Sequence, residues 1–227
     1  MLSRAAVKPL LMPDPAAAQR AVGAAVAQLE VEGLGAERWL DGRAADPALR
    51  EPFEAGTEKA KSETATSACN KVSEAAASAP ELQGIRPALV LLVDDKGKVL
   101  GRDGSSMMRG DDLAAAYPSL KTALEGGTSM SDVWVNKARN EQMLASFAPI
   151  RGGDGKILGA IVFGSSLNDE RLTSASDKTS GYPLAFAIKA DKALHVVAKS
   201  SSMDEALSTA LATGTAAETA LQALETG

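Results

Sequence analysis

The chain has very few of the residues on which many catalytic and metal centres depend. Its 227 residues include one cysteine, Cys69, and one histidine, His195. A lone cysteine cannot form an internal disulfide, and one residue of each type cannot build a multi-cysteine or multi-histidine metal cage. We therefore expect no metal site and no cofactor. Cys69 is expected to be a small buried residue of a helix.

Aromatic residues are also scarce, at 4% of the chain, and no long hydrophobic run is present. A helix that spans a bilayer needs roughly 20 apolar residues, and a signal peptide needs an apolar core that the N-terminus lacks. The chain as given is therefore expected to be soluble, whether it is whole or trimmed of membrane segments. Its length suits one generous domain, or one domain with a helical extension.

The charge balance argues against nucleic acid as a partner. The formal net charge is −5, and the sequence offers no basic stripe that would neutralise phosphates. We therefore expect no nucleic-acid partner. An acidic protein still binds anions locally, so a small carboxylate ligand is compatible with this composition.

Two stretches near the N-terminus carry helix signals. An Asp-Pro pair at 14–15 predicts a helix start, and Gly33 is the expected end of that helix. The same pair recurs at 46–47, and Gly56 is not expected to stop the second helix before Pro80. This second helix carries a narrow stripe of mostly small residues: Leu49, Phe53, Ala60, Ala68, Val72, Ala75 and Ala79. The stripe packs on the first helix, forms a dimer contact, or does both.

Short apolar runs follow, at 88–95, 99–103, 132–136, 142–150 and 156–164. Tight turns containing glycine, at 96–98 and 152–155, predict that these runs form an antiparallel sheet. Between the second and third strands lies a longer insertion, 104–131, in which an aspartate at 111 or 112 and then Pro118 start short helices. A sheet covered on one face by such an insertion is a natural place for a pocket.

The last third of the chain contains a helix, a hairpin and a helical tail. Asn168 starts the helix and Gly181 ends it, and 183–189 pairs with 193–199. Capping-box patterns at 202–205 and 215–218 predict two short helices. We divide the chain into an N-terminal helical region (1–80), a core (81–200) and a helical tail (201–227). Whether 183–200 extends the first sheet or begins a second unit stays open.

The segments "LVDDKGKVLGRD" and "DVWVNKARNEQMLASFAPIRGGDGKILGAIVFGSSLNDERL" resemble the PAS-like Cache sensor domains of bacterial chemoreceptors and histidine kinases. The resemblance covers roughly 46–167. It implies an α+β fold in which an antiparallel PAS-like sheet packs against long N-terminal helices, with short C-terminal helices after it. It also implies an extracytoplasmic setting, with membrane helices and an output module outside this chain.

Candidate ligand contacts lie on the third strand. Successive strand residues point to opposite faces, so Trp134 and Asn136 share one face while Val133 and Val135 share the other. A buried aromatic ring with a polar neighbour suits the lining of a small-molecule site. The alternative is that Trp134 fills the core and Asn136 faces solvent.

Arginine matches a carboxylate with a planar fork of donors. Arg102 and Arg109 flank or occupy the insertion, and Arg139 follows the third strand. We prefer Arg109 as the clamp for an organic acid or amino acid because it lies beside two methionines and a glycine. Tyr117 and Ser146 are further candidates, since each offers a hydroxyl.

A serine hydrolase is the remaining enzyme hypothesis, because Ser165 and Ser166 follow a strand and His195 is available. However, the sequence has no Gly-x-Ser-x-Gly elbow and no phosphate-binding glycine loop. His195 is expected to pack in an apolar strand. We therefore expect no enzyme and assign no catalytic residue.

The function expected from the sequence is that of a ligand-binding sensor domain. A small polar metabolite, a carboxylate by preference, would bind between the sheet and the insertion, and the N-terminal helices are a candidate homodimer contact. The alternative is a structural or protein-interaction module without a small-molecule ligand, in which alanine-rich helices mediate assembly.

Overall fold

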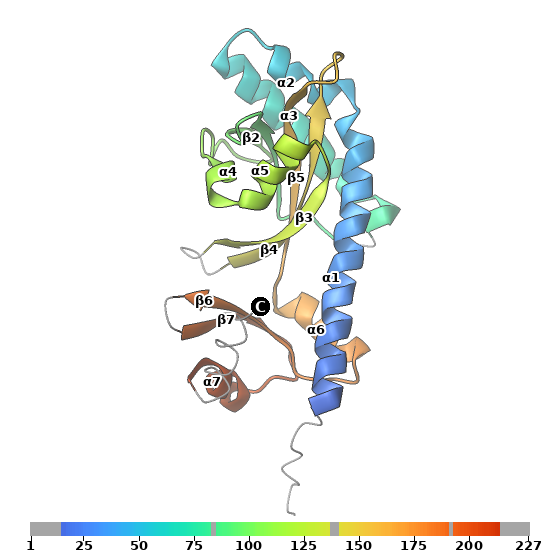
Figure 1. Cartoon of the computed structure of the whole chain (residues 1–227), viewed down its shortest axis with the longest axis vertical. Helices are drawn as coiled ribbons and strands as arrows, with labels where there is room; N and C mark the ends of the chain where they lie inside the picture. Colours follow the sequence, from blue (N-terminus) through green and yellow to red (C-terminus); the bar gives the residue numbers. More distant parts are fainter. Residues whose placement is uncertain (1–14, 83–84, 137–140, 191–192, 214–227) are drawn as a thin grey trace, which may run out of the picture. The chain divides into compact units, whose positions relative to one another are not determined.

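A computed structural model describes residues 15–82, 85–136, 141–190 and 193–213. The chain divides into two compact units, one formed by Leu29–Leu167 and the other by Met1–Gln28 with Asn168–Gly227. The division expected from the sequence, into 1–80, 81–200 and 201–227, stays a prediction. Figure 1 shows the helices and strands along the chain.

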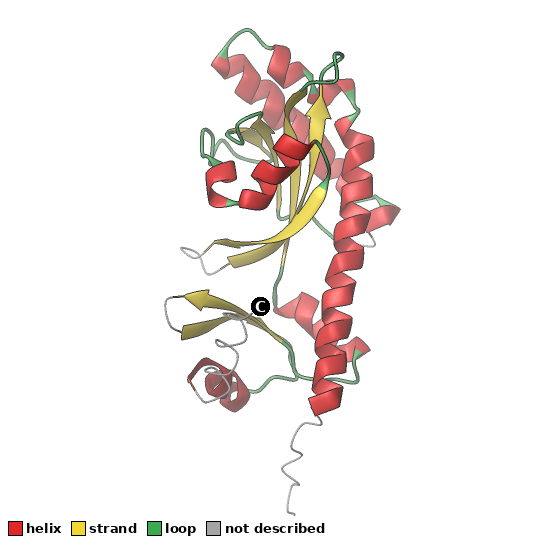
Figure 2. Cartoon of the chain, in the orientation of Figure 1, coloured by secondary structure: helices red, strands yellow, loops and turns green. Residues whose placement is uncertain are grey.

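The larger unit is built on a five-stranded sheet (Figure 2). Its strands are β1 (Leu89–Asp94), β2 (Val99–Arg102), β3 (Met130–Asn136), β4 (Glu141–Arg151) and β5 (Ile157–Ser166). The order is β2-β1-β5-β4-β3, and every neighbouring pair is antiparallel. The predicted antiparallel sheet is therefore confirmed. The predicted turns contain Gly97 and Gly155, whose φ angles of 81° and 82° suit glycine.

Both faces of this sheet are covered. One face packs against α1 (Pro15–Ala44) and α3 (Glu58–Ala76), and the other against α4 (Leu113–Ala116) and α5 (Pro118–Gly126). The apolar run of β1 is buried on both sides for this reason. The helix face of the sheet contributes Val90, Leu92, Ala148, Ile150, Ile161 and Phe163, and the insertion face contributes Leu89, Leu91, Val93, Ala145, Phe147, Ala160 and Val162.

Helix α1 begins where the sequence predicts, at Pro15, but it does not end at Gly33. It continues to Ala44, and Gly33 lies inside it, where its lack of a side chain has a packing role. A Cβ atom at this position would lie 3.0 Å from the Cβ and Oγ atoms of Ser131, so glycine allows α1 to lie close against β3. The predicted helix end was wrong.

The unbroken helix expected over 47–79 was also wrong. A 3₁₀ turn η1 (Pro47–Leu49) and a short α2 (Glu51–Glu54) come first, and α3 starts only at Glu58. Ala55 has extended backbone, and the Thr57 Oγ1 atom accepts a hydrogen bond from the Ala60 N–H at 3.2 Å. This N-cap restarts the helix after the break around Gly56. A second 3₁₀ turn, η2 (Pro80–Leu82), leads towards β1.

The stripe of small residues on this segment packs against other parts of the same chain. Its members Leu49, Ala68 and Val72 are buried in the core between the helices and the sheet, and three others pack against that core: Phe53, Ala75 and Ala79. The in-chain interpretation of the stripe is therefore confirmed.

The smaller unit contains the first part of α1, α6 (Asp169–Lys178), β6 (Ala185–Ala190), β7 (Ala193–Lys199) and α7 (Glu205–Thr213). Strands β6 and β7 form their own two-stranded antiparallel sheet. The hairpin of 183–200 therefore does not extend the five-stranded sheet. The apolar core of the smaller unit consists of Ala21, Leu172, Ala175, Leu184 and Ala198.

A chain of hydroxyl groups joins α6 to the hairpin in this unit. The Leu184 N–H donates to Ser200 Oγ at 2.9 Å, and Ser202 Oγ lies 2.9 Å from Ser200 Oγ and 2.8 Å from Ser176 Oγ. Ser176 Oγ donates to the Tyr182 carbonyl oxygen at 2.6 Å. We call this arrangement the serine relay.

The serine relay explains why the predicted capping box at 202–205 was wrong. The Ser202 hydroxyl is engaged with two other serines. Asp204 caps α7 in its place, because its Oδ1 atom accepts from the Leu207 N–H at 2.8 Å. The second tail helix, expected from 215, lies outside the described residues.

Within the described ranges, no helix has both the length and the apolar character that crossing a membrane requires.

Candidate functional site

The insertion between β2 and β3 forms two short helices, as the sequence predicts. Asp112 caps α4 by accepting from the Ala115 N–H at 2.9 Å, Pro118 opens α5, and Gly127 ends it with a left-handed backbone. Helix α5 lies against β3 and β4. The insertion therefore covers the sheet through the buried side chains of Leu113, Leu120, Ala123 and Leu124.

An aromatic stack joins the insertion to the sheet. The rings of Tyr117 and Trp134 are parallel within 3°, with centroids 4.1 Å apart, and Trp134 also stacks on Phe147 at 5.9 Å. The structure thus brings together two residues that the sequence singled out separately. Burial raises the pKa of the Tyr117 phenol above its usual value, so this hydroxyl keeps its proton at neutral pH.

Two polar atoms in this layer are buried and have no hydrogen-bond partner among the described residues. They are Nε1 of Trp134, a side chain that is 3% exposed, and Oγ of Ser119 in the first turn of α5. We call them the unpaired donors. Ser119 precedes the buried Ala123 by one helical turn, which places it on the sheet-facing side of α5.

Sequence analysis missed Ser119. The sequence signal that could have drawn attention to Ser119 is the N-cap of α5. Tyr117 occupies this position, where serine, threonine, aspartate or asparagine is usual. The Tyr117 side chain makes no capping hydrogen bond. The first turn of α5 thus starts without a side-chain acceptor, although the Tyr117 carbonyl oxygen accepts from the Leu120 N–H at 3.1 Å.

The remaining candidates on the sheet lie on different faces. Asn136 shares the insertion face with Trp134, as the uninterrupted register of β3 requires, and it is half-buried. Ser146 lies on the opposite face, because Phe147 next to it packs under the insertion. The Ser146 hydroxyl is 2.8 Å from that of Ser131, which faces α1. The structure therefore does not bring Ser146 to the side of Trp134, contrary to our expectation.

The arginines that we expected to clamp a ligand bind parts of their own chain. The exposed Arg109 donates through Nη2 to the Glu58 carbonyl oxygen at 2.7 Å, at the start of α3. Arg102 donates through Nε to the Asp103 carbonyl oxygen at 3.2 Å, and its Nη1 lies 3.8 Å from the Met108 sulfur. Arg139 lies outside the described residues.

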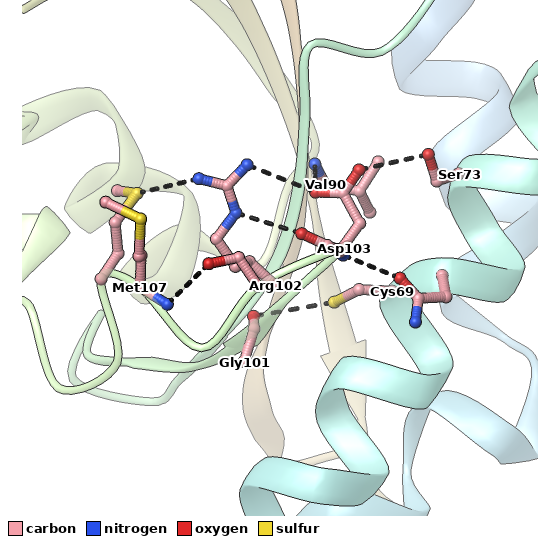
Figure 3. Close-up of polar contacts among 11 residues, drawn as sticks. Cys69, Ser73, Val90, Gly101, Arg102, Asp103 and Met107 are labelled. Carbon is pink, nitrogen blue, oxygen red and sulfur yellow. Dashed lines mark hydrogen bonds and ion pairs between the residues drawn. The ribbon is translucent and has the colours of Figure 1, made fainter.

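Asp103, which the sequence analysis did not single out, connects four parts of the fold (Figure 3). Its carboxylate accepts from the Val90 N–H at 3.0 Å and from the Ser73 hydroxyl at 3.2 Å, and it lies 3.8 Å from Arg102 Nη2. The adjacent Gly104 N–H donates to Asn70 Oδ1 at 2.9 Å. These bonds fasten the start of the insertion to β1 and to α3.

The same junction holds the cysteine. Cys69 is fully buried on α3, and its Sγ atom is 3.7 Å from the Gly101 carbonyl oxygen (Figure 3). A Cβ atom at Gly101 would lie 2.9 Å from Ala65 Cβ, so glycine permits this close approach. Burial, and next the negative charge of Asp103, raises the pKa of the Cys69 thiol. The prediction of a buried helical cysteine is confirmed, and the thiol is a poor nucleophile.

The residues of the hydrolase hypothesis have ordinary surroundings. Ser165 is buried and its Oγ atom donates to the Leu144 carbonyl oxygen at 3.4 Å. His195 is exposed on β7, so the expectation that it packs in the core was wrong. The two residues belong to different units of the chain.

A hollow of about 370 Å³ lies beside the β1–β2 turn, lined by charged residues of both signs from the turn, α4 and α5. In the turn, Asp94 Oδ1 accepts from the N–H groups of Lys96 and Lys98 at 2.9 and 2.8 Å, as expected for a solvated turn. On α5, Lys121 and Glu125 form an exposed ion pair at 3.8 Å. The hollow is therefore a solvent-exposed depression of the surface rather than an enclosed site.

Comparison with known proteins gives matches in structure only. No protein-family model matches the sequence, and no curated protein does. The sensor domain of the histidine kinase DctB from V. cholerae aligns with a TM-score of 0.52 at 16% identity, over 82% of this chain and 64% of that chain. This chain thus spans less than two thirds of the length of that sensor domain.

Two further structures align with lower TM-scores. The periplasmic domain of LuxQ from V. cholerae gives 0.48 at 13% identity, over 79% of this chain and 77% of that chain. The ligand-binding domain of the amino acid chemoreceptor PctC from P. aeruginosa, in complex with GABA, gives 0.46 at 20% identity, over 81% and 73%.

At these identities the similarity concerns the fold. The predicted fold class, a PAS-like antiparallel sheet with long N-terminal and short C-terminal helices, is confirmed. The resemblance that the sequence suggested is thus a likeness of fold: this chain has the fold of the sensor domain of the histidine kinase DctB.

Proposed function

We propose that this chain is the extracytoplasmic ligand-binding domain of a bacterial signal-transduction protein. A small polar metabolite, an organic acid or an amino acid, binds on the insertion side of the five-stranded sheet, beside Trp134 and Tyr117. Membrane helices and the output module lie outside this chain. The fold shared with the DctB sensor domain supports the class of protein.

One observation carries the ligand site. The indole N–H of Trp134 is buried where the insertion meets the sheet, and no described residue accepts its hydrogen bond. Most buried donors in proteins are paired, and an unmade bond of this kind costs about 1–3 kcal/mol. A bound molecule with an acceptor group would remove that cost.

The contacts of the insertion provide a route for a signal. A ligand shifts an equilibrium only through different affinities for two conformations. The segment 101–110 is bonded to α3 through Asp103, Gly104 and Arg109. A shift in the position of the insertion on ligand binding would therefore be transmitted through these bonds to α3, the helix that packs on the other face of the sheet.

A second copy of the chain is the proposed partner of α1. Six of the seven stripe residues lie in or against the core of the chain, whereas Val31 and Leu34 of α1 are 58% and 56% exposed. The two residues are three apart and so lie on one face of the helix. We assign the homodimer contact to this face.

The second candidate function is a structural or protein-interaction module without a ligand. The aromatic stack of Tyr117, Trp134 and Phe147 favours it, because these rings fill much of the layer under the insertion. Thermal-shift measurements and calorimetric titration with organic acids and amino acids separate the two functions. A sensor domain is stabilised by at least one compound, whereas a melting temperature that no compound raises would favour the module.

A further inference from the structure

The buried groups at the start of α5 are neutral donors rather than arginine side chains. Resting on the proposed function, we propose that a carboxylate of the ligand accepts hydrogen bonds from Trp134 Nε1 and Ser119 Oγ at the N-terminus of α5. This assignment replaces the arginine clamp that the sequence suggested, since Arg109 and Arg102 are bonded to Glu58 and Asp103.

The start of α5 suits an anion. The first N–H groups of a helix lack partners one turn earlier, and the aligned peptide dipoles place a partial positive charge there. In α5, Pro118 has no N–H and the Leu120 N–H donates to the Tyr117 carbonyl oxygen at 3.1 Å, which leaves the Ser119 N–H among the first three residues. In most helices an N-cap side chain accepts one of these N–H groups, but Tyr117 does not do so. The helix has nine residues, enough for its dipole to act at the first turn.

Trp134 is adjacent to this helix end. Its indole ring lies flat against the ring of Tyr117, the residue at the N-cap, with 4.1 Å between the centroids. Its side chain is 97% buried, and within the described part of the chain its N–H bonds to nothing. The buried Ser119 hydroxyl, two residues into the same turn, likewise has no partner among the described residues.

The chemistry of these groups selects the ligand. An indole N–H only donates, and the first turn of α5 adds the N–H of Ser119. Together with the hydroxyl of Ser119 they offer donors to both oxygens of a carboxylate, whereas a primary amide presents one acceptor and a repelled NH₂ group. Because the protein groups are neutral, the binding constant should depend only weakly on salt, unlike that of an exposed arginine clamp.

The test uses the whole chain and a panel of short-chain carboxylic acids and amino acids, each paired with its primary amide. Calorimetric titration is carried out on the unmodified protein and on Trp134→Phe, Ser119→Ala and Ser119→Thr. Trp39→Phe is the matched control, because Trp39 has an equally buried N–H without a described partner but lies on the helix face of the sheet.

We expect at least one acid to bind and its amide to bind about tenfold more weakly or worse, since a hydrogen bond to a charged group is at stake. Trp134→Phe and Ser119→Ala should each lose about tenfold in affinity, whereas Ser119→Thr and Trp39→Phe retain it. Phenylalanine can keep the stack with Tyr117, and alanine suits a helix, so at least one variant is expected to fold.

The outcomes separate this inference from the proposed function. If no compound binds the unmodified protein, the sensor function itself fails. If an acid binds but its amide binds equally well, or if Trp134→Phe and Ser119→Ala bind it as tightly as the unmodified chain, the sensor function stands and the assignment of the carboxylate to these donors is overturned.

Discussion

The ring of Tyr117 lies parallel to the ring of Trp134, at 4.1 Å between centroids, and so ties the insertion to the edge strand β3. An aromatic pair of this kind contributes about 0.5–1.5 kcal/mol beyond the area that it buries. Because one ring comes from the turn between α4 and α5 and the other from the sheet, the stack fixes the position of the insertion. This relationship can be tested without knowledge of the ligand.

We expect Tyr117→Ala to lower the free energy of unfolding by more than 1 kcal/mol, since both the stack and buried area are lost. Urea unfolding followed by tryptophan fluorescence measures the change. Tyr117→Phe is the control: it keeps the ring, loses only the hydroxyl, and should stay within about 0.5 kcal/mol of the unmodified protein. Equal stabilities of the alanine and phenylalanine variants would show that the stack does not hold the insertion.

Asp103→Asn should destabilise the protein, because the carboxylate accepts from Val90 and Ser73 and lies near Arg102. The loss of a charged acceptor predicts a decrease of about 1–3 kcal/mol in the free energy of unfolding. Asp95→Asn is a matched control at the exposed β1–β2 turn and should have little effect. A variant at 103 that is as stable as the one at 95 would contradict the role of this junction.

The raised pKa of Cys69 predicts a loss of stability at alkaline pH. As the pH rises through the ordinary thiol value of about 8.5, the unfolded chain loses the cysteine proton while the folded chain keeps it. The folded state then binds more protons, so the free energy of unfolding falls with increasing pH. Denaturant titrations over this range on the unmodified protein and on Cys69→Ala measure the difference in slope.

The same burial predicts that a thiol reagent does not modify Cys69 in the native protein and modifies it fully in urea. The alanine variant should show a shallower alkaline decline than the unmodified chain. Parallel declines in the two proteins would assign the pH dependence to other groups, and rapid labelling under native conditions would show that α3 opens readily.

Leu34→Glu should abolish self-association through α1. A charged side chain in the centre of an apolar contact lacks a partner there, and the cost of burying it is several kcal/mol. Sedimentation velocity at several concentrations measures the oligomeric state, and circular dichroism checks the fold. Leu207→Glu, on α7 at similar exposure, is the control. If the unmodified protein sediments as a monomer at all concentrations, the homodimer proposal is wrong.

Local patterns were sufficient for the sheet and for the insertion. Short apolar runs and glycine turns predicted β1 to β5, and an aspartate at 111 or 112 and Pro118 predicted the starts of α4 and α5. These features depend on neighbours in the sequence. The pairing of Tyr117 with Trp134 depends on how the insertion folds back, and the sequence named both residues without linking them.

The predictions that were wrong concern residues whose role depends on contacts with parts of the chain distant in the sequence. Gly33 has the appearance of a helix end, yet its lack of a side chain serves the contact with Ser131, about a hundred positions away. Neighbouring strand residues such as Ser146 and Phe147 point to opposite faces, but only the folded chain tells which face the insertion covers. Arg109 was chosen by its local setting, whereas the carbonyl group that it binds belongs to Glu58.

The serine relay has a built-in polarity. Each hydroxyl has one proton to give, and the Tyr182 carbonyl oxygen can only receive, so Ser176 points its proton there and must accept from Ser202. Ser202 in turn accepts from Ser200, which takes the amide proton of Leu184. Hydrogen bonds aligned head to tail polarise one another. Removal of the Ser202 hydroxyl would therefore leave the direction of the remaining bonds unchanged. It would weaken the bonds of Ser176 to Tyr182 and of Leu184 to Ser200 together, and so loosen the connection between α6 and the hairpin.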